Sequence, residues 1–446
     1  MRWALPLLFV LLPLQWVVVP VPALGRLPLH LVALLAFTLA IFAVSTLPAF
    51  RPVLRLAAAF VTANVVLNLI WFATSVYHGQ SSRDAVEQMI AVFTFLAVAS
   101  VVCRGARRPQ SRILVWARWA ALACIASVTI ALAVSTVSSG INPVAVLGRT
   151  ATQADPAVLR EELFQPAFAA FGLDTELARA QLRHEIFGAV LTAIFLSVAA
   201  THVHPFRSRS AQALYRASIA VSTLFIVMSL SRAVILALAS WPLLALWRSL
   251  RSGQLSVRQL VLTVVTGLAA AGLAVTGLLS VLWIRFTTDT SSYAARDALL
   301  SDALAAIGDH WLTGGVNTVG TSSHNLILDS WLRAGVFAAA AALVVVGLLA
   351  VLWLTLAGRL HVEAAWVLPI TAALTLPLIR AFTVGGGSLP PGQWVCLGIV
   401  AGFLAFRIES GTTVRREAAT PKEDTQNTPP RSRRALGQGN GVKAIP

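Results

Sequence analysis

The residues of this chain best suited to chemistry lie in a short polar segment directly before a long apolar run. The segment consists of Ser322, Ser323, His324 and Asn325, and the run begins Leu326-Ile327-Leu328. A Ser before such a run commonly caps a helix, so we expect Ser322 or Ser323 to be the N-cap and His324 to lie in the first turn. The positive end of the helix dipole opposes protonation of an imidazole there. Because a neutral imidazole can accept a proton from a hydroxyl group, His324 is the candidate general base.

Two arginines could supply binding groups beside such a base. Arg232 lies between two long apolar runs, and Arg296 begins a segment with apolar residues at helical spacing. A guanidinium group binds phosphate oxygens through two parallel hydrogen bonds, so both residues suit a substrate with a diphosphate. We expect an amphipathic helix that directs Arg296 inward. Its apolar face would hold Leu299, Leu300, Ala303, Leu304 and Ile307, opposite Asp297 and Ser301.

Each of these residues also has a simpler interpretation. Arg232 could be an anchor at the membrane interface, because arginines near helix ends extend their charge to water. Arg296 could be an ordinary surface charge, and His324 a polar loop residue without a role. The shared location of all three on one predicted face of a membrane favours the functional interpretation.

The elements that position these residues are predicted to cross a membrane. Hydrophobic residues make up 57% of the 446-residue chain and charged residues 12%, and the mean hydropathy is +0.78. Apolar runs of roughly 17 to 25 residues, long enough to span about 30 Å as a helix, occur about twelve times. They lie near 3–20, 27–47, 53–76, 85–103, 113–137, 186–203, 212–230, 233–248, 259–282, 334–357, 364–380 and 391–407. The predicted fold class is all-α, a polytopic membrane protein of about twelve transmembrane helices.

Basic residues predict how these helices are oriented. Arginines recur in every second connection, which places those connections and both termini in the cytoplasm of a bacterium, with the chain in the inner membrane. The predicted parts are transmembrane helices 1–5 (1–137), a periplasmic loop (138–185), helices 6–9 (186–282), a periplasmic catalytic loop (283–333), helices 10–12 (334–407) and a disordered cytoplasmic tail (408–446). The first loop is expected to form a helical hairpin on the membrane surface. Asp155-Pro156 would start its first helix, Gly172 would end it, and Asp174 would cap the second.

Charge and cysteine content argue against two other kinds of site. The net charge of +16 comes from arginines spread over short connections, without a soluble domain to present them to nucleic acid. The three cysteines lie in or at the ends of predicted spans, which supports neither a disulfide framework nor a thiolate metal site. No metal or other cofactor is predicted.

The segment around His324 resembles the signature of the O-antigen ligase and O-antigen polymerase superfamily. In that signature a His followed by Asn, Ser or Gln precedes a Gly, as His324-Asn325, nine further residues and Gly335 do here. Arg232 in a Ser-Arg-small context, Arg296 at the start of a loop helix, and a long outer loop before the tenth span are also similar to the family. The chain departs from the family at Ala338, where Gly, Thr or Tyr is usual, and at 311–316, which matches a Gly-rich motif only in part.

The resemblance implies transfer of a glycan from an undecaprenyl-diphosphate carrier to an acceptor hydroxyl on the periplasmic face, with inversion at the anomeric carbon and without a metal. His324 would be the catalytic base, Arg232 and Arg296 would bind the diphosphate, and Asn325 would support His324. The implied partners are the lipid-linked glycan donor, a lipid or glycan acceptor such as lipid A core, and membrane lipids.

Three other functions remain open from the sequence. A polymerase would extend the glycan on its own carrier with the same donor chemistry, and another glycan transferase would differ in its acceptor. A solute transporter belongs to a different class, in which about twelve spans are common. The predicted spans hold few charged residues apart from Glu87, whereas transporters usually carry polar or broken-helix sites near the midplane.

Overall fold

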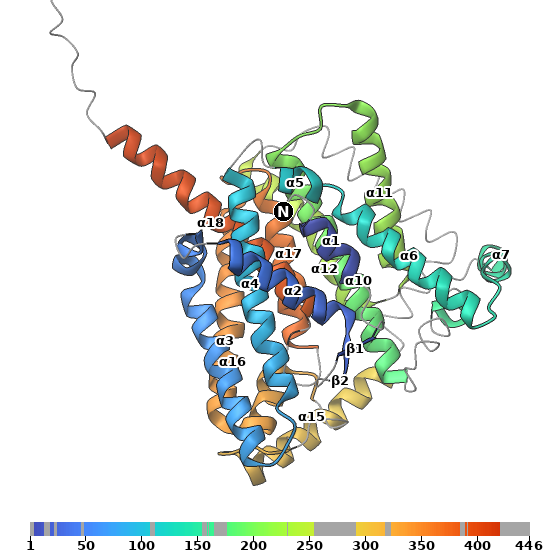
Figure 1. Ribbon diagram of the computed structural model, residues 1–446, viewed down its shortest axis with the longest axis vertical. Coiled ribbons are helices and arrows are strands. Elements are labelled where there is room, and N and C mark those ends of the chain that lie inside the picture. Colours follow the sequence, from blue (N-terminus) through green and yellow to red (C-terminus); the bar gives the residue numbers. More distant parts are fainter. Residues whose placement is uncertain are drawn as a thin grey trace, which may run out of the picture. The chain divides into compact units, whose positions relative to one another are not determined.

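The computed structural model consists mainly of helices, with one short β-hairpin near the N-terminus (Figure 1). It describes residues 4–12, 18–21, 25–45, 49–107, 112–153, 158, 160–164, 176–229, 231–253, 291–316, 323–383, 389 and 391–419. The helices are α1 (Ala4–Leu11), α2 (Leu29–Val44), α3 (Arg51–Tyr77), α4 (Arg83–Arg107), α5 (Arg112–Ala117), α6 (Ala120–Ser138), α7 (Pro143–Gln153), α10 (Glu176–Val203), α11 (Arg209–Met228), α12 (Arg232–Ser252), α15 (Ser291–His310), α16 (Leu326–Arg359), α17 (Val367–Ala381) and α18 (Pro391–Ala419), with the π-helical turn η2 (Arg160–Phe164). The hairpin pairs β1 (Val18–Val21) antiparallel with β2 (Gly25–Pro28). Residues 1–406 form one compact unit and residues 407–446 a second.

Seven of the described helices are long and apolar enough to cross a membrane. They are α3, α4, α6, α11, α12, α16 and the part Ile186–Val203 of α10, and shorter apolar stretches lie in α2, α17 and α18. Several of these helices carry large apolar side chains on their outer surface, such as Leu69 in α3, Leu243 in α12 and Leu354 in α16. Contiguous apolar surface of this kind is unfavourable in water and suits contact with lipid.

Among the described helices, eight form a ring of neighbours around α18. Each contacts the next in the order α1, α2, α4, α3, α16, α17, α10, α6, and α6 contacts α1 again. Contacts of α18 with four of them pair Gly398 with Phe95, Trp394 with Phe60, Cys396 with Ala373 and Gln393 with Gly188. Every residue from Gly392 to Ala405 is buried, as expected of an apolar helix with neighbours on all sides. α18 is therefore the central helix.

Two glycines allow α18 to approach α4 closely. Gly398 and Gly402 lie one turn apart on the same face of α18. A Cβ atom at Gly398 would lie 2.9 Å from the Phe95 carbonyl oxygen, and one at Gly402 would lie 2.6 Å from that of Ala99. Small residues at this spacing commonly bring two helices together in a membrane.

Helix ends gather in two groups, and we call the first the basic end. It holds Arg104, Arg107, Arg118, Arg207, Arg209, Arg248, Arg251 and Arg359. Arg118 joins two helix termini there: its guanidinium donates to the carbonyl oxygen of His204 at 2.8 Å and lies 4.3 Å from the centroid of the Phe206 ring. Burial lowers the pKa of Arg118, and its guanidinium donates two hydrogen bonds to backbone carbonyl oxygens, those of Val115 and His204. Arg248 of α12 likewise donates to the carbonyl oxygen of Glu363, just before α17.

The opposite ends of the helices form the second group, which we call the His324 end. It contains the connection 78–82 between α3 and α4, the loop 311–316, and residues 323–335 at the start of α16. α17 ends there, and α12 begins there, because each has its other terminus at the basic end. The segregation of arginines agrees with the predicted alternation of connections, while the side of the membrane that each end faces stays a prediction.

The structure differs from the predicted elements in several places. The predicted first span, 3–20, is wrong as a continuous helix, because α1 ends at Leu11 and β1 begins at Val18. The described residues are almost entirely helical, as the predicted all-α class requires, and the hairpin is a short local addition to it. The span 113–137 is two helices, α5 and α6, which break at Arg118 and Trp119. The span 259–282 lies outside the described residues, and α18 extends to Ala419, past the predicted start of the tail at 408.

Candidate functional site

The start of α16 contains the predicted base, but its cap differs from the expected one. Asn325 is the N-cap: its Oδ1 atom accepts hydrogen bonds from the backbone N–H groups of Ile327 at 2.9 Å and Leu328 at 3.3 Å. The expectation that Ser323 caps the helix is therefore wrong, and Ser322 lies outside the described residues. His324 precedes the cap instead of lying in the first turn. Asn caps a helix as effectively as Ser, so the choice between the two depends on tertiary contacts.

His324 adopts a backbone conformation that L-residues rarely use. Its φ angle is 56°, and it is the only non-glycine residue with positive φ among those described. Such a conformation costs free energy and persists only where neighbouring contacts hold it. The half-buried imidazole is thereby placed at the mouth of α16, ahead of its N-terminus.

A buried carboxylate holds the residue before His324. Asp329, with no exposed surface, accepts hydrogen bonds at Oδ1 from the Ser323 backbone N–H at 2.7 Å and from Ser323 Oγ at 2.8 Å. Asp329 lies in the first turn of α16, so these bonds fold the chain back over the helix start. On the other side of His324, Asn325 is fixed because it caps α16. Hydrogen bonds therefore hold both residues next to His324 in the chain. Sequence reasoning noted Asp329 only as one acidic residue of the loop.

A break in α16 ends this first helical segment. Gly335 has φ 77° and ψ −172°, a combination that is nearly exclusive to glycine. A Cβ atom there would lie 1.9 Å from the carbonyl oxygen of Leu312, so no side chain fits. The loop 311–316 lies against the break: Gly315 N–H donates to Arg333 O, Val316 N–H to Leu332 O, and Val336 N–H to Trp311 O. His324-Asn325 and Gly335 thus delimit one short helix, which gives their spacing a structural reason.

The connection between α3 and α4 closes over the same loop. Gln80 Nε2 donates to the carbonyl oxygen of Gly315 at 2.7 Å, and the ring of His78 occupies the space beside Gly315. Arg333, which is 8% exposed, donates to Asp84 Oδ2 at 2.7 Å and lies 5.0 Å from the centroid of Trp71. Residues far apart in sequence therefore fix the position of the segment that carries His324.

α15 confirms the predicted helix in the second long loop but corrects its buried face. Ala303 and Ile307 are buried and pack with Leu332 of α16. Leu300 and Leu304, placed on the same face by the sequence, are 39% and 54% exposed. The buried side is narrower than predicted because α15 covers one short helix and not a broad surface. The side chain of Arg296 lies outside the described part of the chain, so its inward direction stays a prediction.

Arg232 is the first residue of α12, at the His324 end. Its level follows from the neighbouring helix α17, which runs antiparallel to α12. The contact of Arg248 with Glu363 at the basic end gives the two helices a common starting level. From that level, Arg232 lies sixteen residues away along α12, and Ile379 lies sixteen residues away along α17. Sixteen residues correspond to about 24 Å along either helix axis. Arg232 is therefore close to the level of Arg380, the penultimate residue of α17.

Arg333 and Arg380 were not singled out from the sequence. Both are buried, at 8% and 4% exposure, and both lie at the His324 end. A signal existed, because arginines at the predicted outer ends of spans contradict the positive-inside pattern, as Arg232 does. Buried cations in membrane proteins usually mark ion pairs or substrate sites. The His324 end therefore holds two buried arginines that sequence reasoning did not single out, one of them paired with Asp84.

Chemically, this arrangement combines an imidazole with guanidinium groups at one end of an apolar bundle. Within the described ranges, no group of three His, Cys, Asp or Glu side chains could hold a metal ion. No protein-family model matches the chain, and no curated protein is significantly similar to it. The interpretation therefore depends on the residues themselves.

Proposed function

We propose that the chain is an O-antigen-ligase-like glycosyltransferase of the bacterial inner membrane. It would move a glycan from undecaprenyl diphosphate to the hydroxyl group of a lipid or glycan acceptor at the His324 end, which we take to face the periplasm. The proposal includes about twelve spans, with both termini cytoplasmic. The resemblance around His324 supplies the reaction class, and the geometry supports the assignment of roles.

In this proposal His324 removes the proton from the acceptor hydroxyl, and the oxygen then attacks the anomeric carbon. The bond from that carbon to the carrier diphosphate breaks in the same displacement, so the configuration inverts. Arg232 and Arg296 bind the diphosphate and stabilise the negative charge that it gains on leaving. Asn325 uses its carboxamide oxygen as the helix cap, so only its NH₂ group would be available to support His324 or the substrate.

The observation that carries the proposal is the held conformation of His324. A left-handed residue fixed by Asp329 through Ser323 and by the Asn325 cap is costly for a loop without a role. α12, which carries Arg232, begins at the His324 end, and α15, which carries Arg296, packs against α16 at that end. Pre-organised groups of this kind are typical of a catalytic site.

Deletion of the gene, followed by gel profiling of surface polysaccharide and of lipid-linked precursor, tests the proposal. A ligase deletion should leave a bare acceptor and accumulated polymeric glycan on the carrier. A polymerase deletion should instead leave the acceptor with a single repeat. An unchanged profile of both pools, with restored solute uptake on complementation, would favour a transporter and contradict the proposal.

A further inference from the structure

α7 follows the membrane-spanning helix α6 after a turn of only four residues, 139–142. The turn ends α6 through a hydrogen bond from Ile141 N–H to Thr136 O at 2.9 Å, with Gly140 at φ 68°. Asn142 then caps α7, since its Oδ1 accepts from Val144 N–H at 3.1 Å and Ala145 N–H at 3.2 Å. α6 begins beside Arg118 at the basic end. α7 therefore lies at the level where α6 ends, remote from the basic end.

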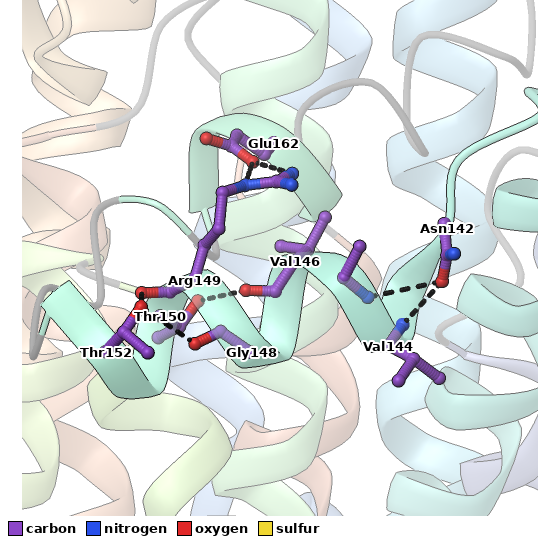
Figure 2. A network of polar contacts seen from close by, with 9 residues as sticks. Asn142, Val144, Val146, Gly148, Arg149, Thr150, Thr152 and Glu162 are labelled. Carbon is purple, nitrogen blue, oxygen red and sulfur yellow. Dashed lines mark hydrogen bonds and ion pairs between the residues drawn. The ribbon is translucent and has the colours of Figure 1, made fainter.

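The two faces of α7 differ in polarity. On one side Val146 is 2% exposed, and Arg149 Nε donates to Glu162 Oε2 of η2 at 2.8 Å (Figure 2). Val144 points away from this pair in Figure 2 and is 76% exposed. Leu147, one turn further along, is 51% exposed. The exposed face is thus apolar, and the face with the ion pair is polar.

The exposed face of α7 continues an apolar stripe of α6. Ile130, Val134 and Val137 lie at helical spacing on α6 and are 65%, 56% and 81% exposed. Because α6 is long and apolar enough to cross a membrane, we expect these side chains to face lipid. Val144 and Leu147 follow directly after this stripe in the chain. Their side chains therefore lie where they can enter the leaflet that the end of α6 would contact.

We propose that α7 is an interfacial helix that inserts Val144 and Leu147 between the lipid headgroups and the acyl chains. The Arg149–Glu162 pair would stay on the aqueous side. Since Glu162 neutralises the one basic residue of α7, insertion is driven by apolar burial and not by attraction to anionic lipid. This proposal is independent of the proposed transfer reaction. The helical hairpin predicted from Asp155, Pro156, Gly172 and Asp174 lies outside the described residues and stays a prediction.

Depth-dependent quenching in nanodiscs of phosphatidylcholine tests the proposal with the full chain. Leu147→Cys and Thr152→Cys are labelled separately with an environment-sensitive maleimide; Thr152 is exposed on the polar side of α7. The native Cys103, Cys124 and Cys396 are buried and should stay unlabelled. Val134→Cys provides the reference for a side chain in the lipid core.

The label at Leu147→Cys should be quenched by a nitroxide near the lipid headgroup and protected from aqueous iodide. The label at Thr152→Cys should instead be quenched by aqueous iodide and not by the nitroxide. Added phosphatidylglycerol, an anionic lipid, should change the quenching at neither position. Equal iodide quenching at both positions would overturn the proposal, because α7 would then lie in water. Protection of Leu147→Cys from both quenchers would also overturn it, because protein would then cover the face.

Discussion

Asp329 and Ser323 are joined by two hydrogen bonds, one to the backbone and one to the hydroxyl group of Ser323, across the start of α16. The carboxylate is fully buried, so loss of either bond leaves a polar group without its acceptor in an apolar surrounding. We therefore expect the left-handed conformation of the adjacent His324 to depend on Asp329. This relationship makes Asp329 a positioning residue for the proposed reaction.

Replacement of Asp329 should impair transfer without touching the imidazole. Asp329→Ala removes the oxygen that accepts both hydrogen bonds, which costs roughly 1–3 kcal/mol, and we expect at least about a tenfold lower transfer rate from the misplaced base. Asp329→Asn keeps an acceptor oxygen and should restore most of that rate at matched expression. The measurement is transfer by membranes to an acceptor glycolipid, with thermal unfolding recorded in parallel. Equal rates for Asp329→Ala and the unmodified chain would refute the positioning role.

The chemical role of His324 can be separated from its backbone role. Asn tolerates the left-handed region better than Ala does, so His324→Asn removes the imidazole with little strain. If His324 is the general base, His324→Asn should lower the transfer rate by about 10² to 10⁴ while donor binding and unfolding temperature stay near those of the unmodified chain. A His324→Asn variant that transfers glycan at the normal rate would show that the imidazole is not required.

Substitution by Lys distinguishes diphosphate binding from interfacial anchoring. Lys keeps the charge of Arg232 and Arg296 but lacks the planar fork, so both Lys variants should bind the donor more weakly or turn over more slowly. Arg251→Lys is the matched control, because Arg251 lies at the basic end over the ring of Trp247. The readout is the donor concentration dependence of transfer. Normal kinetics in both variants would support the interpretation as anchors.

Gly335 should tolerate no side chain. Gly335→Ala places a methyl group against the carbonyl oxygen of Leu312 and forces Ala into a glycine-only conformation. We expect the free energy of unfolding to fall by at least about 3 kcal/mol. Gly347→Ala in the same helix is the control, because a Cβ atom there meets nothing within 4 Å. Thermal unfolding in detergent measures both, and similar stability of the two variants would contradict the described break.

Topology can be tested with single cysteines on exposed positions. Ser301→Cys, in α15, should react with an impermeant thiol reagent in intact spheroplasts if the His324 end faces the periplasm. Ser208→Cys, exposed before α11 at the basic end, should react only after lysis. The reverse pattern would put His324 on the cytoplasmic side. The transferase proposal would then be withdrawn, because the glycan acceptor would be inaccessible.

The sequence by itself determined most of the helices and their ends. Long apolar runs form helices wherever backbone groups must be satisfied within the segment, and the boundaries of α3, α10 and α12 at the basic end lie within a few residues of the predicted ones. Arginines at every second connection correctly separated one end of the helices from the other, since charges avoid the apolar interior. His324 and Asn325 were singled out by their residue types before a long apolar run, and Gly335 by the resemblance to the superfamily signature; their roles stay predictions.

Only the tertiary structure decided which residues hold the site together. Ser323 and Asn325 are equally good caps by local propensity, and the contact of Ser323 with Asp329 leaves Asn325 as the cap. α18 and α11 are both apolar, yet residues 392–405 of α18 are buried, and Gly398 and Gly402 allow this helix to pack closely against α4. The pairing of Arg333 with Asp84 joins residues 249 positions apart, which no local pattern encodes. Such contacts depend on how helices are arranged in space, and that arrangement is a property of the whole chain.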